Sequence, residues 1–352
     1  MTAIYFTTQL TIMRKSKVAI TGLILFSAIT AKSQAKPIDA VEFFKDDRVI
    51  NMTLTVDMKN LVTAKRDTNN VPATVTMAFP DSTVITEDIK MKPKGEFRRK
   101  NCYIASLQLD FKKQGAPLTS LKKIKLIGGC SKSSSDEQLL LKEYLTYKIY
   151  NLFTDMSFRV RLLNVTYKDS REKAKPYTQY AFMIEDFDEM AKRNQCVKRE
   201  TGLQNEQTDR KQMTLVSFFQ YMIGNTDWSV PTLHNIKLIK SKKDSLAVPF
   251  VIPFDFDYTG FVNASYALPP EMFNTTAITE RVYRGFARSP EEVEAMRNFF
   301  LSKEAAVRSV ITDCKLLEGK VKKEALEYID EFYQVAKSQK QSQSEFIDKA
   351  RN

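Results

Sequence analysis

The sequence predicts an α+β fold with a β-rich first part and a mainly helical second part. Between residues 51 and 126, short runs alternate apolar and polar residues and are separated by Pro, Asn, Asp and Gly, a pattern typical of antiparallel strands. After residue 185, apolar residues recur mainly at helical spacing. The 352 residues are 43% apolar and 27% charged, which excludes disordered and collagen-like chains.

The first 35 residues have the pattern of a secretory signal peptide. Arg14, Lys15 and Lys17 precede an apolar run at 18–31, and small residues follow at 33–35. The run of about 14 residues is shorter than the roughly 20 that cross a bilayer, so a signal anchor is the less favoured alternative. We expect export to the periplasm or the extracellular space, with no stable membrane insertion after cleavage.

The charge of the chain does not favour a nucleic-acid partner. The net charge is +12, and residues 1–35 contribute four cations and no acid, which leaves +8 on the remainder. The remaining Lys and Arg residues are interspersed with acids, without an arginine-rich tract or a stacking motif. We therefore expect a solvated basic surface and no nucleic-acid binding.

The predicted elements of the first part, 36–185, are strands and one helix. Strands are expected at 54–58, 73–77, 104–109, 124–126, 159–167 and 180–184. Ser135 or Asp136 is expected to cap the helix, in which Leu141, Tyr144 and Leu145 recur at helical spacing.

The second part, 186–352, is expected to be helical around one hairpin. A helix is predicted at 213–223, and Ser289-Pro290 with Glu292 predicts a helix that starts with a capping box. A last helix is expected to fray into a polar tail from about Lys337.

The four cysteines favour a disulfide over a zinc site. They lie far apart and never form Cys-x-x-Cys. In an oxidising compartment, Cys102 and Cys130 are the preferred pair because both fall in the β-rich region. Buried free thiols are the alternative.

Three polar residues are expected to converge at one end of the predicted hairpin. Asp227 follows the helix at 213–223, Asn235 precedes the first strand, and Asp255 follows the second. Such a set suits phosphoryl transfer, because magnesium on nucleotide phosphates takes one or two carboxylates and other oxygen ligands. Asp227 is then the candidate base that orients a hydroxyl, and Asn235 and Asp255 are the candidate metal ligands. Taken singly, the same residues could instead cap a turn, start a strand or face solvent.

The presence of only one histidine limits the kinds of catalytic and metal site that the chain can form. His234 directly precedes Asn235 and is expected to orient the loop through hydrogen bonds, because the chain has no second histidine with which to share a metal. A Ser or Cys hydrolase is excluded, since Gly-x-Ser-x-Gly is absent and a nucleophile would need a nearby histidine.

The order of these motifs resembles that of the CotH-like (spore coat protein H) kinases, an atypical branch of the protein-kinase-like superfamily. The similar segments are 92–95 with Arg98-Arg99, 121–126, 139–144, 158–162, 224–235 and 253–257. The resemblance implies a two-lobed protein-kinase-like fold that binds ATP with Mg2+ or Mn2+ and phosphorylates hydroxyls of a secreted or envelope protein. It implies that Asp227 is the catalytic acid-base, that Asn235 and Asp255 hold the metal, and that Asp257 assists them.

A kinase also needs a phosphate-binding cation and an adenine site. Lys125 on a strand with Glu143 on the following helix is the preferred pair, and Lys123 and Lys94 are alternatives for the cation. A hinge at 183–186, including Met183 and Glu185, is expected to bind adenine through its backbone.

Several kinase motifs are missing from the sequence. There is no G-x-G-x-x-G loop and no His-Arg-Asp, and Asn235 follows Asp227 by eight positions, whereas the corresponding spacing in ordinary protein kinases is about five. An ordinary protein kinase is therefore excluded. The alternative functions are a catalytically inactive pseudokinase or a binding module of the cell envelope. A carbohydrate-binding or adhesin domain has little support, because the only tryptophan, Trp228, lies inside the polar motif.

Overall fold

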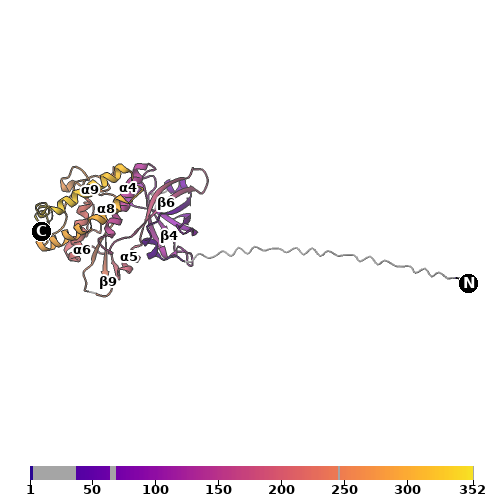
Figure 1. Ribbon diagram of the computed structural model, residues 1–352, viewed down its shortest axis with the longest axis horizontal. Helices are drawn as coiled ribbons and strands as arrows, with labels where there is room; N and C mark the ends of the chain where they lie inside the picture. Colours follow the sequence, from indigo (N-terminus) through magenta and orange to yellow (C-terminus); the bar gives the residue numbers. More distant parts are fainter. Residues whose placement is uncertain (3–36, 64–68, 245, 352) are drawn as a thin grey trace. The chain divides into compact units, whose positions relative to one another are not determined.

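The computed structural model describes residues 1–2, 37–63, 69–244 and 246–351. Almost all of the predicted signal peptide, residues 3–35, lies outside the described residues. Ala35–Asn352 forms one compact unit (Figure 1). Within the described ranges, no helix combines the length and the apolar character needed to cross a membrane.

A closed β-barrel forms the first part of this unit. Its strands follow the order β1-β2-β3-β4-β5-β7-β6, and all neighbouring pairs are antiparallel except β1 and β6. The strands are β1 (Ile50–Val56), β2 (Val71–Ala78), β3 (Val84–Lys94), β4 (Ser106–Asp110), β5 (Lys123–Gly128), β6 (Val160–Asp169) and β7 (Tyr177–Ile184). Inward-facing residues such as Leu54, Leu109 and Val165 are fully buried and fill the interior.

The closed barrel corrects the expectation of a two-lobed protein-kinase-like fold. That expectation of a β-rich N-lobe and a mainly helical C-lobe is wrong, because β1 pairs in parallel with β6 and closes the sheet on itself. Asn51 lies opposite Asn164, 113 positions away in the chain. Alternation within each strand predicts which face is buried but not which distant strand completes the sheet.

Most strands of the barrel were predicted, but β3 was not. The predicted strands overlap β1, β2, β4, β5, β6 and β7, and the antiparallel arrangement of β1 to β5 is confirmed. β3 has a charged outer face, contains Pro93, and buries Glu87 on its inner face. Glu87 is accommodated because its carboxylate accepts a hydrogen bond of 2.7 Å from the Leu118 backbone N–H. The apolar pattern of β3 is therefore weak although the strand is long.

The long helix of the first part packs between the barrel and the helices that follow. α4 (Ser134–Asn151) begins at the cap residue Ser133, close to the predicted cap, and buries Leu141 and Leu145 in the core shared with α6 (Arg210–Met222). The short helices α1 (Ala40–Lys45), α2 (Met58–Thr63) and α3 (Glu96–Asn101) were not predicted. Each spans less than two turns, which is too short for a helical period to show in the sequence.

Helices and a small sheet form the second part of the unit. The sheet has the order β10-β9-β8, and the predicted hairpin is confirmed as its β9 and β10. The other α-helices and the strands of this part are α5 (Phe187–Arg193), β8 (Cys196–Arg199), β9 (Ile236–Ser241), β10 (Phe250–Pro253), α7 (Pro290–Ser302), α8 (Glu304–Thr312), α9 (Gly319–Lys337) and α10 (Gln339–Gln343). The predicted capping box of Ser289 and Glu292 starts α7.

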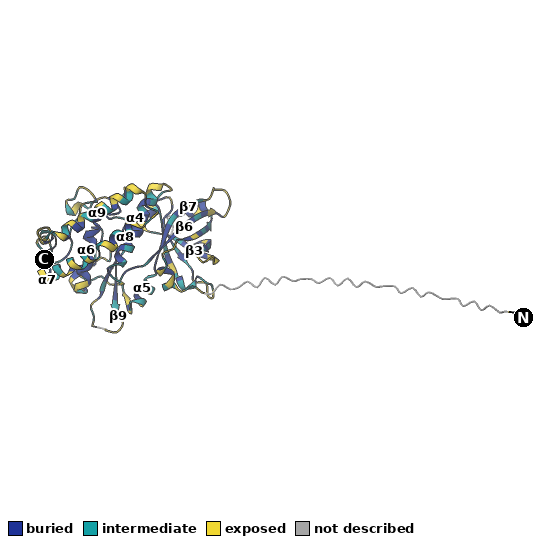
Figure 2. Cartoon of the chain, in the orientation of Figure 1, coloured by how far each residue is buried: buried dark blue, intermediate teal, exposed yellow. Residues whose placement is uncertain are grey.

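The C-terminal segment does not fray as predicted. α10 follows α9 directly, and a π-helical turn at Ser344–Asp348 carries the fully buried Phe346. The Phe346 ring stacks on Phe218 of α6 with centroids 4.3 Å apart. Figure 2 shows buried residues along the barrel strands and on α6, which is the core that this ring joins.

Candidate functional site

Most of the residues predicted from the sequence as site residues line one cleft of about 460 Å³. Asp227, Asn235, Asp255, Asp257 and Lys125 all line it. Its walls come from Gly95, which follows β3, from α3, from β4 and β5, and from the segments that flank the β9–β10 hairpin. The convergence expected for Asp227, Asn235 and Asp255 is therefore present.

Asp227 is held by two neighbours that follow it in the chain. Its Oδ1 lies 2.7 Å from His234 Nε2. The Asn235 side-chain amide donates to both the Asp227 backbone carbonyl and Oδ2, each at 2.9 Å. The Asp227 backbone N–H in turn donates to Asn225 Oδ1 at 2.8 Å. The carboxylate is thus oriented on both oxygens, while 35% of the side chain stays exposed to the cleft.

The β9–β10 hairpin places Asn235 and Asp255 at one end of the small sheet. Ile236 lies opposite Pro253, so Asn235 directly precedes β9 where Asp255 closely follows β10. Both residues adopt left-handed backbone conformations, with φ of 50° and 64°. Asn and Asp tolerate this conformation better than most residues, and such positions concentrate at functional sites.

Asp255 forms an ion pair with Lys125 across the cleft. Lys125 Nζ on β5 lies 3.1 Å from Asp255 Oδ1, and the two side chains are 29% and 34% exposed. The Asp255 backbone N–H donates to the Tyr147 hydroxyl at 2.8 Å, which anchors the loop to α4. Burial acts to raise the pKa of Asp255, but the charges of Lys125 and Arg98 outweigh it and hold the pKa below its usual value.

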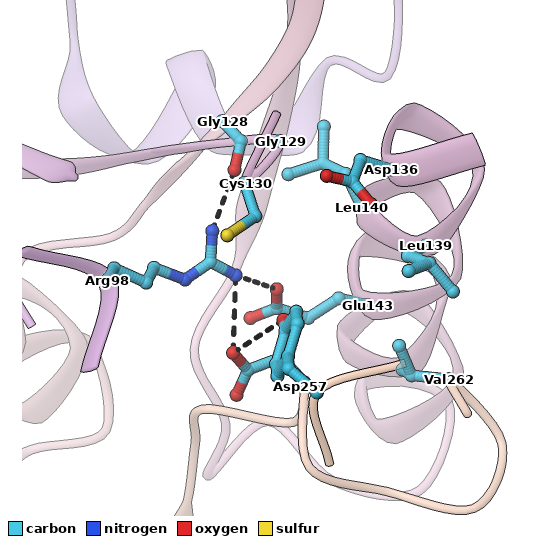
Figure 3. Close-up of a pocket in the computed structure, with 11 residues that line it drawn as sticks. Arg98, Gly128, Gly129, Cys130, Asp136, Leu139, Leu140, Glu143, Asp257 and Val262 are labelled. Atoms are coloured by element: carbon cyan, nitrogen blue, oxygen red, sulfur yellow. Dashed lines mark hydrogen bonds and ion pairs between the residues drawn. The ribbon is translucent and has the colours of Figure 1, made fainter. Parts of the chain in front are cut away.

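The predicted partner of Lys125, Glu143, is paired with Arg98 instead. Arg98 Nη2 lies 3.2 Å from Glu143 Oε2 and 3.3 Å from Asp257 Oδ2, and its Nη1 donates to the Gly128 carbonyl at 2.7 Å (Figure 3). Tyr266 donates its hydroxyl to the same Asp257 oxygen at 3.0 Å. These groups lie in a small polar pocket next to the cleft. Arg98 therefore occupies the place beside the helix carboxylate that the sequence suggested for a lysine.

Two carboxylates share the single Arg98 guanidinium in this buried pocket. Burial and the neighbouring Asp257 charge raise the pKa of Glu143 to about 8, although Arg98 opposes the change. Burial likewise raises the pKa of Asp257. Within the described part of the chain, Glu143 Oε1 is buried without a hydrogen-bond partner. The pocket thus favours a proton on one of the two acids.

Arg98 and Tyr266 were not identified as site residues from the sequence. Arg98 lies in the basic run that contributed to the family resemblance, but it stands beside Arg99 and Lys100 on a short helix. Its burial, at 8% exposure, depends on contacts with Glu143 and Asp257, which are 45 and 159 positions away. No local pattern predicts such contacts.

Met183 and Glu185 of the predicted hinge do not line the cleft. Met183 is fully buried in the barrel core. The Glu185 carboxylate accepts from Arg193 Nε at 2.8 Å and from the Arg159 backbone N–H at 3.1 Å. Both side chains therefore have structural contacts, and adenine binding by the backbone of 183–186 stays a prediction.

The cleft offers oxygen ligands for a divalent cation on a phosphate compound. Among the described residues, no group of three or more His, Cys, Asp or Glu side chains could hold a metal by itself. Magnesium on nucleotide phosphates needs only one or two carboxylates, because phosphate and water supply the other ligands. Asn235 and Asp255 fit this requirement, since the Asn235 amide nitrogen faces Asp227 and leaves its oxygen for another partner. Asp257 fits less well, because Arg98 and Tyr266 contact its Oδ2.

Comparison with known proteins identifies no family for this chain. No protein-family model matches the sequence, and no curated protein matches it. The resemblance to CotH-like kinases therefore rests on the motifs alone, and the function is inferred from the residues of the cleft.

Proposed function

We propose that the cleft transfers the terminal phosphate of ATP to a hydroxyl of a protein acceptor with the help of a divalent cation. The observation that carries this proposal is the arrangement around Asp227. An oriented, partly exposed carboxylate shares one cleft with the oxygen ligands Asn235 and Asp255 and with the cation Lys125. In phosphoryl transfer the protein contributes mainly by positioning charged groups and less by forming covalent bonds itself.

Asp227 is the group that accepts the proton of the acceptor hydroxyl. As the hydroxyl oxygen bonds to the terminal phosphorus, the bond from that phosphorus to the bridging oxygen breaks, and ADP leaves with the electron pair. His234 and Asn235 hold the Asp227 carboxylate for this task. Asn235 and Asp255 would hold Mg2+ or Mn2+, which neutralises negative charge on the phosphate oxygens when bound. Lys125 adds positive charge on the barrel side of the cleft.

Two features support an exported enzyme with a secreted or envelope protein as its acceptor. The sequence pattern of residues 1–35 is that of a signal peptide. Cys102 and Cys130 form the disulfide that was preferred from the sequence, and disulfides persist mainly in oxidising compartments outside the cytoplasm. Cys196 and Cys314 are free thiols.

A nucleotide-binding module without turnover is the second candidate. It is favoured by the ion pairs of Asp255 with Lys125 and of Asp257 with Arg98. These pairs already neutralise two of the three aspartates that line the cleft, so a cation must compete with protein groups for them. Such a protein would bind ATP and a divalent cation but would not transfer phosphate.

Phosphate incorporation measured by mass spectrometry, together with thermal-shift titration, distinguishes the two functions. The purified chain is incubated with ATP and Mg2+, alone and with Ser- and Thr-rich proteins as acceptors. We expect phosphate on the chain or the acceptor, and a loss of about a hundredfold or more in the Asp227→Asn variant, which removes a general base. The same variant should retain the thermal shift with ATP and Mg2+. Asp255→Ala should lose both the shift and the transfer.

Asp313→Asn is the matched control, since Asp313 is exposed on the segment after α8 and does not line the cleft. The Asp313→Asn variant should retain both the thermal shift with ATP and Mg2+ and the phosphate transfer. Full transfer by Asp227→Asn would exclude the role of Asp227. A thermal shift without phosphate transfer in the unmodified chain would favour the nucleotide-binding module, and the absence of any shift would exclude both functions.

A further inference from the structure

A row of basic side chains extends from the cleft onto the outer face of the barrel. Lys94 on β3 lies opposite Ser106 on β4, and Lys92 lies opposite Gln108, which in turn lies opposite Lys125 on β5. Directly opposed residues of an antiparallel pair point to the same face. Lys92, Lys94, Ser106 and Lys125 therefore share one face of the sheet, and Ser106 and Lys125 reach the cleft itself.

Ser106 is a buried polar residue that lacks a protein partner. Only 1% of the residue is exposed, yet it lines the cleft. Its Oγ is buried without a hydrogen-bond partner among the residues that the structure describes. Buried hydroxyls are nearly always hydrogen-bonded, because an unmade hydrogen bond leaves the full desolvation penalty uncompensated. A group that enters the cleft and accepts a hydrogen bond would satisfy this hydroxyl.

The charges around Ser106 are unbalanced in favour of cations. Across the described residues, Lys92 and Lys94 form no ion pair, whereas Lys123 has Asp110 at 3.8 Å and Lys125 has Asp255 at 3.1 Å. Burial and the neighbouring charges of Lys92 and Lys123 lower the pKa of Lys94. Mutual repulsion among these cations would be relieved by an anion from outside the chain.

We infer that Ser106 and Lys94 form a subsite for a phosphate group, with Lys92 and Lys125 contributing positive charge. A phosphate group presents several acceptor oxygens in different directions, so it can accept from one hydroxyl and from ammonium groups at the same time. An acidic peptide fits less well, because the Ser106 hydroxyl is too deeply buried for a chain of carboxylates to follow the row and also reach it. The subsite lies on the barrel side of the cleft, whereas Asp227 and Asn235 belong to the other part of the unit.

This inference rests on the proposed function only for the identity of the phosphate compound. If the cleft binds ATP, the subsite receives part of its phosphate chain and directs the terminal phosphate toward Asp227. Binding of the phosphate chain can be measured without transfer and without a metal, so the two ideas can fail separately.

Isothermal titration calorimetry with tripolyphosphate in the presence of EDTA tests the subsite. We expect binding by the unmodified chain, and affinity reduced about tenfold in Lys94→Gln and about fivefold in Ser106→Ala, in line with the loss of charge-assisted hydrogen bonds. Lys94→Arg keeps the charge and should bind within about threefold of the unmodified chain. Thermal unfolding of each variant verifies that the fold is intact.

Lys90→Gln is the matched control. Lys90 lies four positions from Lys94 on the same face of β3, is exposed, and lies opposite Asp110 of β4, whereas Lys94 lies opposite Ser106. Its variant should bind tripolyphosphate within about twofold of the unmodified chain, since a single distant surface charge is screened by salt. Equal losses in Lys90→Gln and Lys94→Gln would overturn the subsite in favour of a general charge effect. Unchanged binding in Ser106→Ala, or no binding by the unmodified chain, would also overturn it.

The outcomes also separate the subsite from the proposed function. Specific tripolyphosphate binding without phosphate transfer from ATP would retain the subsite and exclude the enzyme. Transfer from ATP that is unaffected by Lys94→Gln and Ser106→Ala would retain the enzyme and exclude the subsite.

Discussion

The Arg98 guanidinium and the Glu143 carboxyl group form a buried contact that joins α3 to α4, with Nη2 3.2 Å from Oε2. The two side chains are only 10% and 1% exposed. The same guanidinium contacts Asp257, which lies two residues after Asp255 of the cleft. The position of α3, which forms one wall of the cleft, therefore depends on contacts with a helix and a loop that are distant in the sequence.

Removal of the Arg98 guanidinium is expected to destabilise the protein strongly at high pH. In Arg98→Met, Glu143 and Asp257 face each other without a counter-charge, and breaking a buried pair in this way costs about 3–5 kcal/mol of unfolding free energy. The loss should be smaller at pH 5, where the two acids can take up protons. Urea denaturation at pH 5 and pH 8 measures both values.

Lys320→Met is the control, because Lys320 is 88% exposed and 3.9 Å from Glu324. Equal stability of Arg98→Met and the unmodified chain at pH 8 would contradict the stabilising role of the Arg98 contacts with Glu143 and Asp257.

The raised pKa of Glu143 predicts that stability falls as the pH rises. The folded chain keeps the Glu143 proton up to about pH 8, whereas the unfolded chain releases it near the usual value of about 4.3. Between these values the folded state binds more protons, so this group contributes stability at low pH that is lost as the pH rises toward 8.

The Glu143→Gln variant resembles the protonated acid and should lack this pH dependence. Relative to the unmodified chain, it should gain at least about 1 kcal/mol of unfolding free energy between pH 5 and pH 8. Urea denaturation at several pH values gives the difference. A constant difference across this range would show that Glu143 does not titrate there.

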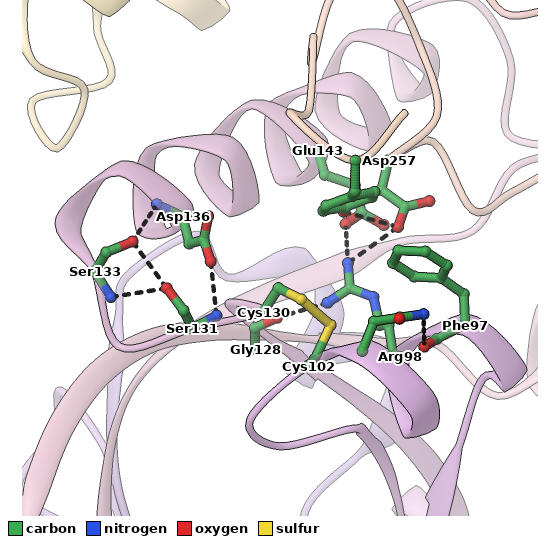
Figure 4. The surroundings of a disulfide bond; sticks show 12 residues. Phe97, Arg98, Cys102, Gly128, Cys130, Ser131, Ser133, Asp136, Glu143 and Asp257 are labelled. Carbon is green, nitrogen blue, oxygen red and sulfur yellow. Dashed lines mark hydrogen bonds and ion pairs between the residues drawn. A yellow bond between two sulfur atoms is a disulfide. The ribbon is translucent and has the colours of Figure 1, made fainter. Parts of the chain in front are cut away.

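The Cys102–Cys130 disulfide is expected to stabilise the fold and to hold α3 against the barrel (Figure 4). Cys102 directly follows α3, and Cys130 lies two residues after Gly128, whose carbonyl accepts from Arg98. The cysteines are 28 positions apart. A closed loop of that length corresponds to about 3–4 kcal/mol in the chain-entropy model. The double variant Cys102→Ser with Cys130→Ser should lose about this much unfolding free energy.

Hydrogen exchange of the backbone amides of residues 96–101 should increase in the same double variant, because α3 loses the disulfide that connects it to the segment after β5. Cys314→Ser removes a free, partly exposed thiol and serves as the control. Unchanged exchange in this helix would show that the Arg98 contacts hold α3 without the disulfide. A loss of stability in Cys314→Ser as large as that in the double variant would contradict the stabilising role of the disulfide.

Local patterns along the chain were enough to predict many of the helices and strands and the residues at their ends. Alternating runs predicted most barrel strands, helical spacing predicted α4 and α6, and Ser289 with Glu292 predicted the start of α7. The hairpin pattern also predicted that Asn235 and Asp255 meet near Asp227, because two adjacent strands return the chain to one end. These features depend on neighbours close in the chain, so a local pattern contains the information.

The closure of the barrel and the pairing of charged side chains depend on contacts between distant segments, which local patterns do not contain. The parallel contact of β1 with β6, the pairing of Arg98 with Glu143, and that of Lys125 with Asp255 all join distant segments. Alternation and helical spacing specify which face of an element is buried, but several charged residues can occupy the same kind of position. The partner of each charge depends on which side chains remain within reach after the whole core has packed.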